Sequence, residues 1–177
     1  MRNQLFSQRL GTAIAVTFLL TFLAMPWSFC QTTGADEPGY YNQRGLEYFK
    51  KGFYDHAPKN QVTEAEKNYG FAIREFKLAI SKDSSYTEAH LNLARVYYVQ
   101  KNFENAAEEY KRVTELRPGD LDAYVNLALA LIELKRTDEA IQALEQAKTQ
   151  TSNPKVLSMF DTYIAKVLEH QAREVNK

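Results

Sequence analysis

The sequence has little of the chemistry from which metal sites and disulfides are made. Its 177 residues include one cysteine, Cys30, and three histidines, His56, His90 and His170. A single cysteine forms neither an internal disulfide nor a cysteine metal site. The histidines share no spacing that would bring them together as metal ligands. We therefore expect a fold that is stabilised by packing alone, with no metal and no cofactor.

Motifs of catalysis and of nucleic-acid binding are also missing. The chain has no glycine-rich phosphate loop and no nucleophile motif. Basic and acidic side chains balance at 22 each, without the basic patch that nucleic-acid binding requires. His90 stands where the repeat described below places an aromatic residue, which indicates packing rather than a ligand role. We expect a protein that is not an enzyme and that binds neither nucleic acid nor a small-molecule substrate.

A long apolar run occurs near the N-terminus. Arg2 and Arg9 precede the run AIAVTFLLTFLAM at residues 13–25, and Pro26 follows it. This order is typical of a secretory signal, with cleavage after Cys30 (residues 1–30) or after Ala35. Extended to Phe29, the run also approaches the length of a membrane anchor, residues 13–29. A lipoprotein is disfavoured because Phe29 precedes Cys30. The expected location is the periplasm, or else the inner membrane through the uncleaved segment.

One helical pattern occurs twice. AHLNLARVYY at residues 89–98 is followed thirty-four residues later by AYVNLALALI at residues 123–132. Four positions are identical at this offset: Ala89 with Ala123, Asn92 with Asn126, Leu93 with Leu127, and Ala94 with Ala128. The same landmarks return upstream at Gly45 and Ala72 if fifteen residues are inserted between the two helices. The chain therefore contains three units.

These landmarks resemble the tetratricopeptide repeat family, whose period is thirty-four residues. The resemblance covers about residues 40–150 and departs from the family at Arg44, which stands in a leucine place. It implies an all-α fold of antiparallel helical hairpins stacked in a right-handed superhelix. The residues that define the repeat are Gly45, Tyr48, Ala72, Phe76, Ala94, Tyr97, Ala106, Tyr110, Pro118, Ala128, Ala140 and Leu144.

The pattern also divides the chain. We expect a first unit at residues 38–86, with an insertion at 55–66, a second at 87–120, a third at 121–153 and a capping helix at 154–173. Thr63 and Glu66 have the spacing of a capping box, so a helix should begin near Glu64. Asp120 and Asn153 should cap the helices that follow them. The insertion is expected to form a short Ω-like loop that extends the second helix, with a partner-binding loop as the alternative.

In the family, the first helix of each unit lines a concave groove that binds peptides. The positions implied here are Asn42, Leu46, Phe49, Lys50, Leu91, Arg95, Tyr98, Val99, Val125, Leu129, Ile132 and Glu133. Most are apolar, as suits an apolar helix or extended segment. The alternatives are that part of this stripe belongs to the hairpin core, or that residues 31–40 cover it.

Some family members hold a partner's terminal carboxylate with basic residues and asparagines in this groove. The matching places here hold Asn42, Leu46, Asn92, Asp122 and Asn126. Only Asn92 fits, and Asp122 would repel a carboxylate. We therefore expect a scaffold or adaptor that binds a peptide or helix of another cell-envelope protein. The alternatives are a self-assembling module that forms homo-oligomers, and an accessory subunit of an envelope enzyme or secretion complex.

Overall fold

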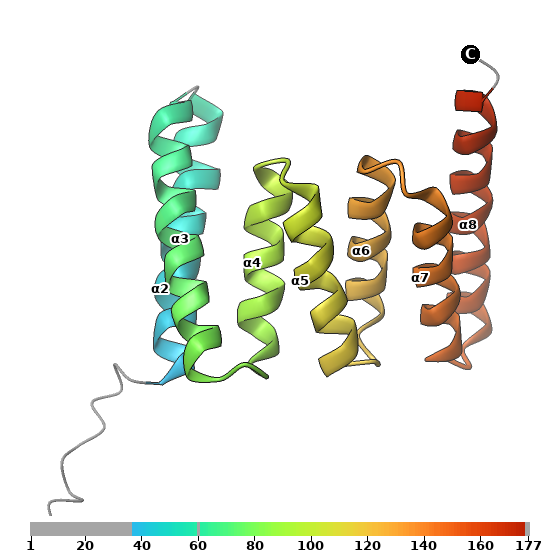
Figure 1. Cartoon of the computed structure of the whole chain (residues 1–177), viewed down its shortest axis with the longest axis horizontal. Coiled ribbons are helices and arrows are strands. Elements are labelled where there is room, and N and C mark those ends of the chain that lie inside the picture. The colour runs from blue at the N-terminus through green and yellow to red at the C-terminus, as the bar shows by residue number, and fades with distance from the viewer. Residues whose placement is uncertain (1–36, 60, 176–177) are drawn as a thin grey trace, which may run out of the picture. The chain divides into compact units, whose positions relative to one another are not determined.

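A computed structural model of the chain describes residues 37–59 and 61–175. The described helices all belong to the unit Ala35–Lys177 (Figure 1). The helices are α2 (Pro38–Lys50), α3 (Val62–Lys82), α4 (Thr87–Val99), α5 (Phe103–Leu116), α6 (Leu121–Glu133), α7 (Thr137–Thr149) and α8 (Pro154–Val175). The apolar run and the expected cleavage sites lie outside the described residues.

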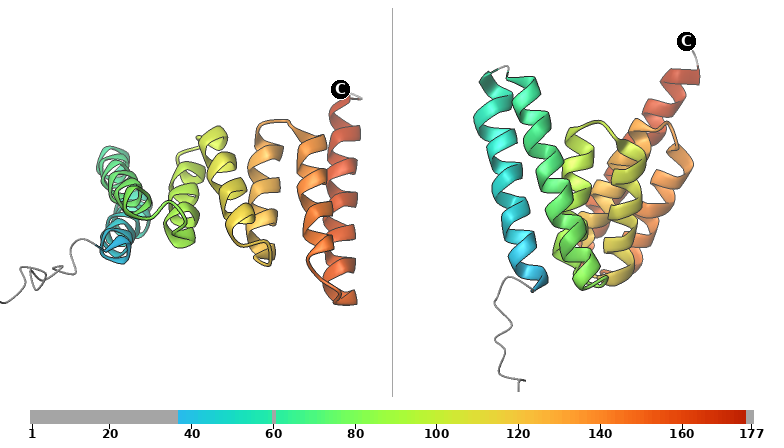
Figure 2. Two further views of the ribbon diagram at one scale, coloured as in Figure 1. Left: turned by 60° about the horizontal axis from the view of Figure 1, so that its bottom comes forward. Right: turned by 60° about the vertical axis from the view of Figure 1, so that its left-hand side comes forward.

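Successive helices pack as antiparallel pairs. α2 pairs with α3, α4 with α5, and α6 with α7, while α8 packs against α7 (Figure 2). Each hairpin buries its apolar stripe against the next one, because a single hairpin has no partner for that stripe. The predicted all-α class of stacked antiparallel hairpins is confirmed.

The core depends on small residues at the points where helices approach closely. Ala72, Ala94, Ala106, Ala128 and Ala140 are all at most 2% exposed. The ring of Phe76 lies against Gly45, where a Cβ would come within 2.5 Å of the Phe76 Cε1 atom. Side chains no larger than a methyl let the helix axes approach, and the neighbouring aromatic ring fills the remaining space.

Most of the described residues of the insertion in the first hairpin are helical. α2 continues directly into a π-helical segment, η3 (Lys51–His56), and a 3-10 turn, η4 (Ala57–Lys59), before α3 begins at Val62. Gly52 in the π-helical turn lies so close to Tyr69 that a Cβ would be 2.8 Å from its ring. The first hairpin is consequently longer than the others (Figure 1). The expected Ω-like loop is wrong, but the expected extension of the second helix is present, because α3 begins at Val62.

Two of the three predicted helix-capping side chains are present. The Asp120 side chain accepts a hydrogen bond from the Ala123 N–H at 3.2 Å, and that of Asn153 accepts one from Lys155 at 3.0 Å. The Thr63 capping box is wrong, because α3 starts at Val62 with Gln61 as its N-cap and without a capping side chain. Because α3 begins one residue before Thr63, this side chain lies inside the first turn and not at the N-cap.

Candidate functional site

The twelve predicted groove residues lie on α2, α4 and α6, the first helix of each hairpin; we call this surface the groove face. Of its apolar residues, only Leu129 is largely exposed, at 44%. The others are half-buried and pack against the core: Leu46, Phe49, Leu91, Tyr98, Val99, Val125 and Ile132. Each of these side chains therefore packs partly against the core and leaves part of its surface exposed on the groove face.

An asparagine pair joins the first two helices of the groove face. The Asn92 side-chain amide donates a hydrogen bond of 3.0 Å to the Asn42 Oδ1 atom, and both residues are buried. Arg95 Nη1 lies 3.5 Å from Asn92 Oδ1. Asn92 was the single residue that matched a carboxylate-binding place, and here its amide is engaged within the fold. Arg95 remains exposed beside the pair.

Tyr98 is tied to its own hairpin. Its ring packs edge-on against Phe103 of α5 with the ring centroids 5.3 Å apart. Burial is also the main cause that raises the pKa of the Tyr98 hydroxyl. Removing this side chain would disturb the α4/α5 contact as well as the surface, so Tyr98 is a poor probe of binding alone.

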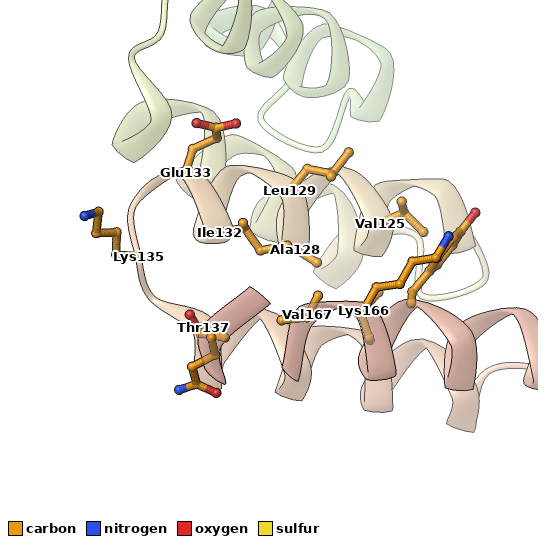
Figure 3. Close-up of a pocket in the computed structure, with 12 residues that line it drawn as sticks. Val125, Ala128, Leu129, Ile132, Glu133, Lys135, Thr137, Lys166 and Val167 are labelled. Carbon is orange, nitrogen blue, oxygen red and sulfur yellow. The ribbon is translucent and has the colours of Figure 1, made fainter. Parts of the chain in front are cut away.

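A pocket of about 870 Å³ opens between α6 and α8 (Figure 3). Four predicted groove residues line it from α6, namely Val125, Leu129, Ile132 and Glu133. The other lining residues come from α6, the turn after it, α7 and α8: Ala128, Lys135, Thr137, Leu144, Tyr163, Lys166, Val167 and Gln171. The groove face thus extends onto the last helix.

Sequence reasoning missed the contribution of α8. Tyr163 and Val167 lie four residues apart, on one face of the segment predicted as the capping helix at residues 154–173. Val167 is buried and Tyr163 is half-buried, so packing accounts for part of their surface. No local sequence signal identifies the pocket, because it depends on how α8 packs on the third hairpin.

His90 connects the turn that precedes α4 to helix α5. Its Nδ1 atom lies 2.6 Å from Glu109 Oε2 on α5, and its Nε2 atom lies 3.1 Å from the Ser84 carbonyl oxygen. The Glu109 carboxylate and the Ser84 carbonyl are both acceptors. The ring can donate to both of them at once only when it is protonated, as the imidazolium. The hydrogen bond to Glu109 is the main cause that raises the His90 pKa. His90 is buried, as its place in the repeat predicts, and its ring is held by polar contacts to Glu109 and Ser84.

We expect the stability of the protein to fall when His90 deprotonates. Because the folded-state pKa is raised above its unfolded value, the stabilisation is complete below the unfolded pKa of about 6.5 and is lost as the pH rises through the folded pKa. Urea melts at pH about 6 and about 8.5 should differ by on the order of 1 kcal/mol. The His90→Phe variant should lose most of this difference. An equal pH dependence in both proteins would contradict the assignment.

The described residues offer no site for metal chemistry. No group of three or more histidine, cysteine or acidic side chains gathers among them. His56 Nδ1 contacts Gln61 Oε1 at 2.7 Å within the first hairpin. Within the same part of the chain, no helix is long and apolar enough to cross a membrane.

The chain belongs to the tetratricopeptide repeat family, whose pattern matches residues 55–120 and 91–154. It is 27% identical over 124 residues to RNA polymerase II-associated protein 3 of rat, covering 59% of this chain and 18% of the relative. The human protein of that name is 26% identical over 124 residues, with the same coverage. This chain therefore spans about a fifth of the length of these curated relatives.

Solved structures show the same fold. The TPR2B domain of yeast Sti1, in its complex with pHsp70, superposes with a TM-score of 0.57 at 19% identity, over 75% of this chain and 97% of that one. The first TPR of Spaghetti (RPAP3), bound to the HSP90 peptide SRMEEVD, gives 0.52 at 21% identity, over 74% and 95%. The predicted superhelix of helical hairpins is confirmed.

The predicted location is wrong. The relatives are mammalian proteins whose name associates them with RNA polymerase II, which contradicts an exported, periplasmic protein and its alternative, an inner-membrane anchor at residues 13–29. The physical argument for export was the length and flanking charge of one apolar run, and that pattern alone does not specify a compartment.

Proposed function

We propose that this protein is a non-catalytic adaptor whose groove face holds a peptide or helical segment of a protein partner. The observation that carries the proposal is the pocket between α6 and α8, which continues the groove face and combines an apolar lining with charged residues at its edge. Small-molecule and peptide sites share this composition, but an open trough along a helix suits a chain segment.

The likeness to peptide-bound repeat domains supports this proposal at the level of fold. The yeast Sti1 and Spaghetti domains have partners of the Hsp70 and HSP90 type. Those partners do not fit this chain, because the amides of Asn42 and Asn92 bond to each other and Asp122, at another of the matching places, would repel a carboxylate. We therefore expect the groove face to bind the side chains of the partner segment and not its terminal carboxylate.

A selection from a random peptide display library against the full-length protein tests the proposal. We expect enriched peptides whose affinity falls about tenfold, or about 1.4 kcal/mol, in the variant Leu129→Ser with Arg95→Ala. Both side chains are exposed, so the thermal melt of this variant should stay close to that of the natural protein.

The matched control carries Glu108→Ala and Gln142→Ser on the outer helices α5 and α7, where both side chains are exposed. It should bind the selected peptides as the natural protein does. Loss of binding in this control, with full binding in the groove variant, would move the site to the outer helices. If the selection enriches no peptide, the proposal fails.

A further inference from the structure

Two lysines line the pocket between α6 and α8. Lys135 lies in the turn after α6, and Lys166 lies on α8. Neither lysine forms an ion pair with any residue in the ranges 37–59 and 61–175. Figure 3 shows Lys135 beyond Ile132 and Lys166 beside Val125, with Ala128 and Val167 between them. The apolar part of the pocket is thus bounded by two free ammonium groups.

Lys148, near the same helices, forms ion pairs with two carboxylates. The Lys148 Nζ atom lies 2.6 Å from Asp161 Oδ1 and 3.2 Å from Glu145 Oε2, and so connects α7 to α8. The pocket itself has one carboxylate, that of Glu133, and Figure 3 shows this side chain directed away from α8. The lining therefore leaves the two lysines available to a ligand.

We propose that this pocket recognises an acidic amphipathic segment of the partner protein. Apolar side chains of the segment enter between α6 and α8, and carboxylates on either side of them pair with Lys135 and Lys166. This inference rests on the proposed function and deepens it by naming the chemistry of the partner.

The dimensions of the pocket agree with such a segment. Its lining on α6 extends from Val125 to Glu133, which corresponds to about 12 Å along a helix axis. About two helical turns fit in that length. Two apolar residues four positions apart would then face the lining made by Ala128, Ile132 and Val167, with an acidic residue beyond each of them.

Side-chain carboxylates fit this arrangement better than a single terminal carboxylate. The two ammonium groups stand at different places along the pocket (Figure 3), so one carboxylate does not serve both. The polar amides nearest a terminal-carboxylate site, those of Asn42 and Asn92, are buried and bonded to each other. Charge complementarity therefore favours acidic residues within the segment.

Two synthetic peptides test the inference on the full-length protein. Each has about twelve residues, enough for about three helical turns, with an acetylated N-terminus, an amidated C-terminus and two leucines four positions apart. One carries glutamates outside the leucines, and the other carries glutamines in their place. Fluorescence anisotropy should show that the glutamate peptide binds about four- to twenty-five-fold more tightly, since each of the two exposed ion pairs contributes a factor of about two to five.

The variant Lys135→Ala with Lys166→Ala should reduce this preference to less than about twofold while still binding both peptides. Its matched control, Lys111→Ala with Lys155→Ala, removes the same net charge at two exposed lysines outside the pocket. The control should keep the full preference for glutamate. Raising the salt concentration should weaken the glutamate peptide more than the glutamine peptide on the natural protein.

The remaining outcomes overturn the inference in ways that separate it from the proposed function. If both peptides bind equally well and both are weakened by Leu129→Ser, the groove binds apolar segments and the charge assignment is wrong. If the variant Lys135→Ala with Lys166→Ala still prefers the glutamate peptide, residues other than these two lysines bind its carboxylates. If neither peptide binds while the display selection succeeds, the groove has a partner of different chemistry.

Discussion

Replacing Ala106 with arginine should destabilise the protein by about 3 kcal/mol or more. Ala106 is 0% exposed on α5 and belongs to the main apolar core. A larger side chain at this position overpacks a close helix contact, which costs about 1–3 kcal/mol. Its guanidinium would in addition lie in an apolar region without a partner, where an unpaired charge is strongly unfavourable.

The matched variant is Glu108→Arg, two residues further along the same helix. Glu108 is exposed, and surface substitutions of this kind usually change the free energy of unfolding by less than about 0.5 kcal/mol. Chemical unfolding of both variants, followed by the helical circular-dichroism signal, gives the comparison. Equal unfolding free energies would contradict the register in which Ala106 packs between helices.

The repeat made most of the fold predictable from sequence. A thirty-four-residue period with alanine at fixed positions leaves few ways to stack helices, because each small residue marks a close approach. Local chemistry fixed the starts of α6 and α8 through Asp120 and Asn153. These features depend on residues near each other in the chain, which is why single-sequence reasoning reached them.

The insertion in the first hairpin was not predictable in the same way. Its polar residues lack the repeat pattern, and a loop agreed with their composition. In the structure, Gly52 lets Tyr69 pack against the π-helical turn, and Phe49 stacks near Tyr69 with centroids 6.0 Å apart. These contacts join residues across the hairpin. A tertiary contact of this kind overrides local preference and leaves no periodic signal.

The candidate site was only partly predictable for the same reason. The family resemblance indicated which positions of α2, α4 and α6 face the groove. It did not indicate that Asn42 and Asn92 bond to each other or that Tyr98 packs on Phe103. Nor did it place α8 beside α6, because α8 departs from the repeat pattern. The pocket depends on how the last helix packs on α7, and no local sequence pattern encodes that.

Replacing Gly45 with alanine should destabilise the protein by about 2 kcal/mol, although alanine favours a helix over glycine by about 1 kcal/mol. The new Cβ would lie 2.5, 2.7 and 2.9 Å from three atoms of the Phe76 ring. Carbon atoms prefer a separation of about 3.5–4.0 Å, and Phe76 is 0% exposed, so its ring has no free space into which to move. The cost of overpacking should exceed the gain in helix propensity.

Gly70→Ala provides the control with the opposite sign. Gly70 lies within α3, is exposed, and has no atom within 4 Å of the position that a Cβ would take. Alanine should therefore stabilise the protein by about 0.5–1 kcal/mol, chiefly by restricting the unfolded chain. Urea unfolding of the two variants should shift the midpoint in opposite directions at a constant slope. If Gly45→Ala also stabilises the protein, the first hairpin is not closed by the contact between α2 and Phe76, and the assignment of Gly45 as a repeat-defining residue fails.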